Sequence, residues 1–147
     1  MSVEVRCTPV VDGVGVRIEN QGQESVHLLD GERMPYLLRT DDALVVLFGV
    51  NPPDPDLDYL GIDIPLTRPL PVGGVEEHRV TLRPLWLRDH YSSERDPVPL
   101  HGAVDVRCEV GWGPTPITAE RAREMSITSL LEWQRLARSE PVRLRLE

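Results

Sequence analysis

The sequence predicts an all-β protein, an antiparallel β-sandwich of about seven or eight short strands. Short segments alternate apolar and polar side chains with a period of two, as half-buried strands do. Turn signals and clusters of proline, which is abundant at 14 residues, separate these segments. The 147 residues match the size of one domain, so we expect a single domain over residues 1–147.

The strand patterns can be followed along the chain. Residues 3–8 and 14–19 alternate, and the second segment ends at an Asn-Gln-Gly turn that leads into a short strand near 26–28. The continuous apolar run at 43–50 is typical of a central strand covered on both faces. Further strands are predicted at 59–64, 79–83, 104–110 and 142–146.

Two similar pentapeptides, VEVRC at 3–7 and VDVRC at 104–108, each end in one of the two cysteines. Their flanking residues differ, which argues against a duplication. Both place two valines and the cysteine on one face and an acid and an arginine on the other, as a half-buried strand requires. We expect the cysteines to pack as small apolar side chains with free thiols, which could approach each other if the strands are neighbours.

One segment departs from the strand pattern. Residues 118–138 contain neither glycine nor proline, which predicts a helical stretch near 119–138. Within it, Ser129 and Glu132 have the spacing of a capping box. The part MSITSLL equally suits a strand.

Two stretches carry a resemblance to a known fold. Residues 16–31, VRIENQGQESVHLLDG, resemble the N-terminal half of many immunoglobulin-like domains, where a strand ends in Asn-x-Gly and the next begins with a small residue and valine. Residues 66–82 resemble the stretch in which a proline-glycine turn leads into a strand. The arrangement is similar to that of the intracellular proteinase inhibitors of bacteria. It implies an immunoglobulin-like sandwich and carries over no functional residue.

Composition excludes several function classes. The chain has 16 basic and 24 acidic residues, a net charge of −8, which disfavours nucleic acid and anionic membranes as partners. All the basic residues are arginine, so lysine-dependent chemistry is excluded. No apolar run reaches the roughly 18–20 residues that span a bilayer, and the N-terminus lacks the pattern of a signal peptide. We therefore expect a cytoplasmic protein.

The densest group of reactive side chains lies in residues 84–101, which we expect to form a long loop between strands. There an imidazole beside a carboxylate would suit general-base chemistry, two histidines could ligate a metal, and arginine with aromatic neighbours would suit an anionic or aromatic ligand. The alternative is a plain connection with its charges in water. The candidate ligand-binding residues are Trp86, Arg88, Asp89, His90, Tyr91 and His101.

A candidate metal site lies in the proline-rich stretch before this loop. Asp54, Asp56 and Asp58 alternate like the first ligands of an EF-hand, but Tyr59 and Pro65 occupy the positions of its glycine and its bidentate glutamate. This excludes an EF-hand and leaves a looser calcium site at the rim of the sandwich. Alternatively, the aspartates initiate turns.

No catalytic residue is identified from the sequence. The serines lie outside any G-x-S-x-G elbow, and the cysteines lack the spacing of a zinc or redox motif. We therefore expect a non-catalytic binding or accessory module without a cofactor, which recognises a protein or peptide through its loops or an edge strand. The alternative is a small enzyme or ligand-binding protein with its site in the 84–101 loop. Self-association through edge strands is a further option.

Overall fold

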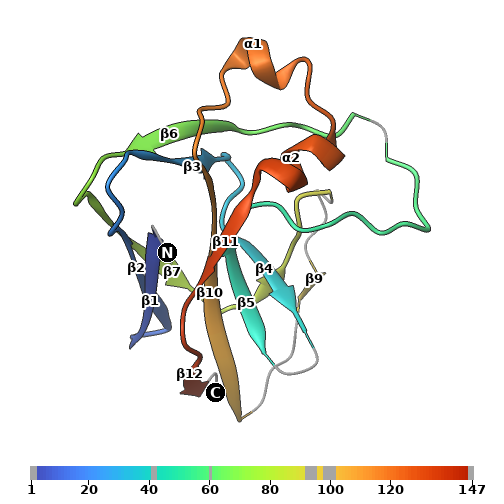
Figure 1. The fold of residues 1–147 in the computed structure, drawn as a ribbon. Coiled ribbons are helices and arrows are strands. Elements are labelled where there is room, and N and C mark those ends of the chain that lie inside the picture. Colours follow the sequence, from blue (N-terminus) through green and yellow to red (C-terminus); the bar gives the residue numbers. More distant parts are fainter. Residues whose placement is uncertain (1–2, 41–42, 60, 92–95, 98–101, 146–147) are drawn as a thin grey trace.

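The computed structural model describes residues 3–40, 43–59, 61–91, 96–97 and 102–145. In these residues strands predominate and the two helices are short, which confirms the predicted all-β class (Figure 1). In the same residues, neither helix has the length and apolar character needed to span a membrane.

The smaller of the two main sheets has three antiparallel strands in the order β1-β2-β7. Their bounds are Val3–Val10 for β1, Gly13–Asn20 for β2 and Val75–Thr81 for β7. The turn after β2 is held by the Asn20 side chain, whose amide nitrogen donates to the carbonyl of Glu24 at 2.9 Å. Its amide oxygen accepts from the Gly22 N–H at 2.9 Å, so the predicted Asn-Gln-Gly turn is confirmed.

The larger sheet is built around the long strand β10, Ala103–Gly113, in the order β4-β5-β10-β3-β6. Strand β5 runs parallel to β10, and the other described pairings of this sheet are antiparallel. Its other strands are β3 Val26–Asp30, β4 Tyr36–Arg39, β5 Leu44–Phe48 and β6 Leu66–Leu70. Two C-terminal strands, β11 Arg135–Arg138 and β12 Val142–Arg145, also pair with β10. A small separate pair joins β8, Trp86–Leu87, to β9, Asp96–Pro97.

Side chains from both main sheets meet in one apolar core. In Figure 1 the strands β1, β2 and β7 lie to the left of β10. Each fully buried valine, leucine or isoleucine contributes roughly 1.5–3 kcal/mol to folding. The alternation predicted for the strands is confirmed, because the inward-facing residues of both sheets are buried there. They include Val5, Val16, Ile18, Val46, Val106 and Val110.

The two similar pentapeptides lie on β1 and β10, which belong to different sheets. Cys108 is fully buried and Cys7 is half-buried, and both belong to or pack against the common core. Their Sγ atoms lie 3.1 Å apart and the thiols are free. The approach of the thiols therefore takes place across the interior and not between paired strands.

The helical stretch near 119–138 is present as two short helices, α1 at Ala119–Ala122 and α2 at Ile127–Trp133. The capping box predicted at Ser129 and Glu132 is wrong by one turn. Ser126 is the N-cap and exchanges hydrogen bonds with Ser129. After α2 the chain becomes extended. Residues 135–138 form β11, which pairs antiparallel with β10.

The predicted set of strands needs correction. The strand expected at 59–64 is wrong: the described residues there are irregular, and Gly61 takes a positive φ of 67°. Strands β4 and β6 were not predicted. In β6 the alternation is interrupted by Pro69, which an edge strand tolerates because one side of its backbone makes no ladder bonds.

Candidate functional site

His90 is a buried residue of the predicted 84–101 site, and both of its ring nitrogens are engaged inside the fold. Nε2 lies 2.7 Å from the backbone carbonyl of Asp63, which can only accept, so Nε2 carries the proton. Nδ1 therefore accepts a hydrogen bond from the Tyr36 hydroxyl at 2.9 Å. Burial lowers the pKa of His90, against the opposing effect of the Asp63 carbonyl. The neutral ring acts here as a structural link.

Arg88 and Asp89 also form hydrogen bonds within the fold. The Arg88 guanidinium donates through Nε and Nη2 to the carbonyl of Pro35 at 3.2 and 2.9 Å. Leu37 and Arg88 exchange two backbone hydrogen bonds of 3.0 Å. The carbonyl of Asp89 accepts from the Arg33 guanidinium at 2.9 Å. These bonds fasten the segment after β8 to the start of β4.

Tyr91 fastens the same segment to the proline-rich loop. Its hydroxyl donates to the Asn51 carbonyl, and the Asn51 side chain accepts from the His90 N–H at 3.3 Å. Its ring lies 4.9 Å from that of Tyr59, measured between centroids. Burial raises the pKa of Tyr91, so its hydroxyl stays protonated. The ligand-binding role predicted for these residues stays a prediction.

The predicted site also includes Trp86 and His101. Trp86 is 40% exposed, and its side chain lines a hollow beside β7. His101 lies outside the described residues. The structure thus brings Arg88, Asp89, His90 and Tyr91 together as one anchored segment.

The predicted metal residues lie on an exposed loop. Asp54 begins a turn, since its carboxylate accepts from the N–H of Asp56 at 2.9 Å. The N–H of Asp54 donates to the Tyr59 hydroxyl at 3.1 Å. Within the described ranges, no three His, Cys, Asp or Glu side chains are grouped so as to hold a metal ion. A calcium site at Asp54, Asp56 and Asp58 stays a prediction.

A different feature, the free edge of β7, offers unpaired backbone groups. In the part of the chain that the structure describes, β7 pairs only with β2. The N–H of Leu82 donates to the carbonyl of Asp12 at 2.7 Å, which marks a hydrogen-bonded pair at the end of this ladder. Such pairs alternate along antiparallel strands, so every second residue directs its backbone away from β2. On β7 these outward-directed residues are Val75, Glu77, Arg79 and Thr81.

A trench runs along this free edge, between β7 and the segment that leads into β4. It consists of two adjoining hollows of about 320 and 280 Å³, which share Pro35, Arg79 and Val80. We call it the β7 trench. Its apolar lining includes Met34, Leu37, Phe48, Pro84 and Trp86.

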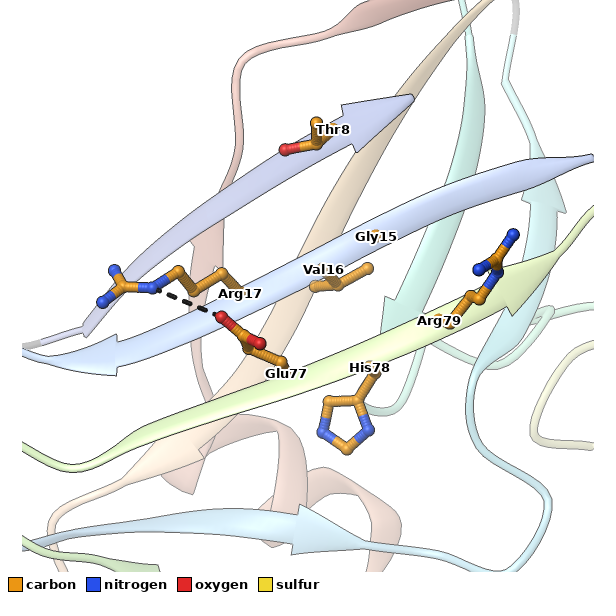
Figure 2. Close-up of a pocket in the computed structure, with 7 residues that line it drawn as sticks. All are labelled: Thr8, Gly15, Val16, Arg17, Glu77, His78 and Arg79. Atoms are coloured by element: carbon orange, nitrogen blue, oxygen red, sulfur yellow. Dashed lines mark ion pairs between the residues drawn. The ribbon is translucent and has the colours of Figure 1, made fainter. Parts of the chain in front are cut away.

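A second, shallower hollow lies on the outer face of the small sheet. Figure 2 shows it over Gly15 of β2, between Thr8 of β1 and Arg79 of β7. Arg17 and Glu77 form an ion pair of 3.9 Å at one end. The hollow of about 350 Å³ exists because glycine supplies no side chain: a Cβ added there would find its nearest neighbour 3.5 Å away. The free edge of β7 therefore has a hollow on each face of the sheet.

Charged groups border the trench unevenly. Arg68 lines it, but its guanidinium is engaged by Glu76 at 2.6 Å and by Asp30 at 3.2 Å. Arg79 donates to the carbonyl of Val11 at 3.3 Å, and no carboxylate of the described chain lies within ion-pair distance of it. Among the described residues, Arg79 is thus a cation at the free edge that forms no ion pair.

The sequence predicted a strand at 79–83 but did not specify that it forms an edge. Edge position depends on which strands pair, and β2 and β7 are more than fifty residues apart. The local hint is the run of charged or titratable side chains Glu76, Glu77, His78 and Arg79 within VEEHRVT, since edge strands are often rich in charge.

Comparison with known protein families, with curated proteins and with solved structures finds no match to this chain. Its function therefore has to be inferred from its own residues.

Proposed function

We propose that this chain is a non-catalytic binding module that takes an extended segment of a protein partner as an added strand on the free edge of β7. The observation that carries the proposal is the row of outward-directed backbone groups at Glu77, Arg79 and Thr81. An added strand would satisfy these donors and acceptors by main-chain hydrogen bonds, as in β-augmentation.

The two hollows give such a strand side-chain specificity. Residues of an added strand point alternately to the two faces of the sheet. Those on the inner face would enter the β7 trench and contact Phe48, Pro35 and Trp86, which favours apolar side chains. Those on the outer face would lie beside the guanidinium of Arg79, which favours aspartate or glutamate. The expected partner is a segment that alternates apolar and acidic residues.

The fold and location expected from the sequence belong to the same proposal. Two sheets that share one core support an immunoglobulin-like sandwich, and such sandwiches commonly bind through edges and loops. We infer a cytoplasmic location for this binding module, since the cysteines are free thiols.

A proline substitution on β7 tests the edge directly. Glu77→Pro removes an outward-directed N–H that β2 does not use, and proline is tolerated on edge strands. Glu77→Ala is the matched control, because it removes the same side chain and keeps the N–H. The probe is a displayed library of twelve-residue peptides with alternating apolar and acidic positions, selected on the wild-type protein and then measured by calorimetry.

We expect selected peptides to bind wild type and Glu77→Ala alike and to lose about fivefold in affinity for Glu77→Pro, because the one main-chain hydrogen bond that is lost contributes about 1 kcal/mol. Circular dichroism must show that Glu77→Pro keeps its strands. Equal binding to both variants, or no selected peptide at all, would refute β-augmentation at β7.

A second copy of this chain is the other occupant that a specific observation favours. When two β7 strands pair antiparallel with His78 at the centre, Glu77 of one copy lies opposite Arg79 of the other, twice. The pairing joins outward-directed residues, as a ladder requires. Registers centred on Glu77 or on Arg79 would place like charges opposite each other, which is destabilising.

Light scattering separates this candidate from the first. Self-association predicts a dimer that Glu77→Arg dissociates and that the double variant Glu77→Arg/Arg79→Glu restores, since the swap regenerates both opposite-charge pairs. A monomer at all protein concentrations would reject the second copy and leave the peptide as the occupant.

A further inference from the structure

We propose that Cys7 and Cys108 form a reversible oxidation site, in which Cys7 reacts with a hydroperoxide and Cys108 converts the product into a disulfide that links the two sheets. This inference is independent of the proposed peptide binding, because it concerns β1 and β10 and not the edge of β7.

The first support is the position of the two sulfur atoms. Their distance of 3.1 Å is shorter than the usual contact of two unbonded sulfurs, and a shift of about 1 Å brings them to covalent length. The two side chains approach from opposite sheets, from the inward faces of β1 and β10. No strand has to change its register for the bond to form.

The second support is the unequal surroundings of the two thiols. Cys108 is fully buried, and its backbone is fixed on both sides by Ser139. Its N–H donates to the Ser139 hydroxyl at 2.9 Å, and its carbonyl accepts from the Ser139 N–H at 2.9 Å. Cys7 lies on an edge strand and is only half-buried, so a small oxidant reaches it first.

Hydrogen bonding between the thiols adds to this asymmetry. The Cys108 thiol donates to Cys7, which lowers the pKa of Cys7, and the Ser139 side chain acts in the same direction. The same bond and burial raise the pKa of Cys108. The thiolate, which is the nucleophile, therefore forms on Cys7, and Cys108 keeps its proton.

The chemistry balances with hydrogen peroxide as the oxidant. The Cys7 thiolate attacks one peroxide oxygen, forming an S–O bond and breaking the O–O bond, and the released hydroxide takes a proton to become water. The Cys108 sulfur then attacks the sulfur of the resulting sulfenic acid. The S–S bond forms, the S–O bond breaks, and the hydroxyl leaves with the Cys108 proton as a second water. The two thiols supply two electrons, and an external dithiol reverses the reaction.

The disulfide would join residues 101 positions apart and tie β1, at the edge of the small sheet, to the central strand of the larger one. A cross-link of that span restricts the unfolded chain strongly, so we expect the melting temperature to rise by on the order of 10 °C on oxidation.

The test treats the wild-type protein with one equivalent of hydrogen peroxide. We expect the intact mass to fall by about 2 Da, both thiols to stop reacting with a maleimide, and dithiothreitol to reverse both changes. Alkylation with iodoacetamide before oxidation, followed by peptide mapping, should label Cys7 before Cys108. Retention of both free thiols, or earlier labelling of Cys108, would overturn the proposal.

Two single variants separate the roles. In Cys108→Ser the sulfenic acid has no resolving thiol, so we expect dimedone to trap it on Cys7 as an adduct. In Cys7→Ser the buried Cys108 should remain a thiol at the same peroxide concentration. If these variants fail to fold, the order of alkylation in the wild type still decides between the two cysteines. Disulfides only between molecules, seen on a non-reducing gel, would also contradict it.

Discussion

The hydroxyl of Tyr36 donates a hydrogen bond to Nδ1 of His90 at 2.9 Å, and both side chains are buried. The bond joins β4 to the segment after β8, while the other ring nitrogen of His90 holds the carbonyl of Asp63. A buried imidazole with both nitrogens satisfied is a cross-link of the fold, and its energetics can be tested.

Removing the Tyr36 hydroxyl should destabilise the protein. Tyr36→Phe leaves the buried Nδ1 of His90 without its donor, which costs about 1–3 kcal/mol. Urea unfolding at pH 8, where the imidazole is neutral in both states, measures the loss. Tyr59→Phe is the control, since the Tyr59 hydroxyl bonds only at an exposed loop, and should change stability by less than about 0.5 kcal/mol. Equal losses of stability in the two variants would show that the hydrogen bond to His90 contributes no more than the exposed one made by Tyr59.

Acidification should destabilise the protein through the same histidine. An unfolded histidine titrates near pH 6.5, and burial lowers the pKa of folded His90, with Arg33 acting in the same direction and Asp63 and Asp89 opposing. Between the two pKa values the unfolded chain binds more protons, so stability falls as the pH drops below about 6.5. Unfolding free energies measured from pH 8 to pH 5 give the slope.

His90→Phe is the variant that checks the assignment. It should be less stable than wild type at pH 8 and should lose most of the slope between pH 7 and pH 5. The bond to Arg68 lowers the pKa of Glu76, and the stability that this shift contributes is lost only as the pH falls below about 4.3, the ordinary pKa of a glutamate. An unchanged slope in His90→Phe would assign the effect to another group.

The fork between Arg68 and Glu76 should make an arginine-to-lysine change costly. Nε and Nη2 of Arg68 reach the two oxygens of Glu76 at 2.9 and 2.6 Å, which ties β6 of the larger sheet to β7 of the smaller. Lysine cannot form this two-point contact, so we expect Arg68→Lys to lose about 1–2 kcal/mol in urea unfolding. Arg83→Lys is the control: Arg83 is 56% exposed and 4.0 Å from Asp12, and should change little. Equal losses of stability in the two variants would mean that water screens the Arg68–Glu76 contact as it does an exposed ion pair.

The fold class could be predicted because it depends on local patterns of apolar and polar residues. In VEVRC and VDVRC the period of two fixes which face is buried, whatever the partner strand, and the structure buries those faces. The helical stretch was located correctly near 119–138, but its last part, residues 135–138, pairs with β10 as strand β11. Pairing with a neighbour outweighed the local helix preference there.

The candidate site could not be predicted because it depends on distant pairing. The sequence drew attention to His90 and Asp89 as reactive types, yet the partners that occupy them, Tyr36 and Arg33, lie more than fifty residues away. The free edge of β7 follows from the order of strands in a sheet, which no local pattern specifies. The approach of Cys7 to Cys108 likewise needs two sheets to face each other.

Two glycines of β2 should respond in opposite ways to the same substitution. A Cβ on Gly13 would lie 1.9 Å from the carbonyl oxygen of Val80, so Gly13→Ala must push β7 away from β2 and should cost about 2–4 kcal/mol. A Cβ on Gly15 meets nothing closer than 3.5 Å, and alanine lowers the entropy of the unfolded chain, so Gly15→Ala should be neutral or stabilise by up to about 1 kcal/mol. Thermal and urea unfolding of the two variants measure the difference. Similar stability of the two variants would contradict the close approach of the Val80 carbonyl to Gly13.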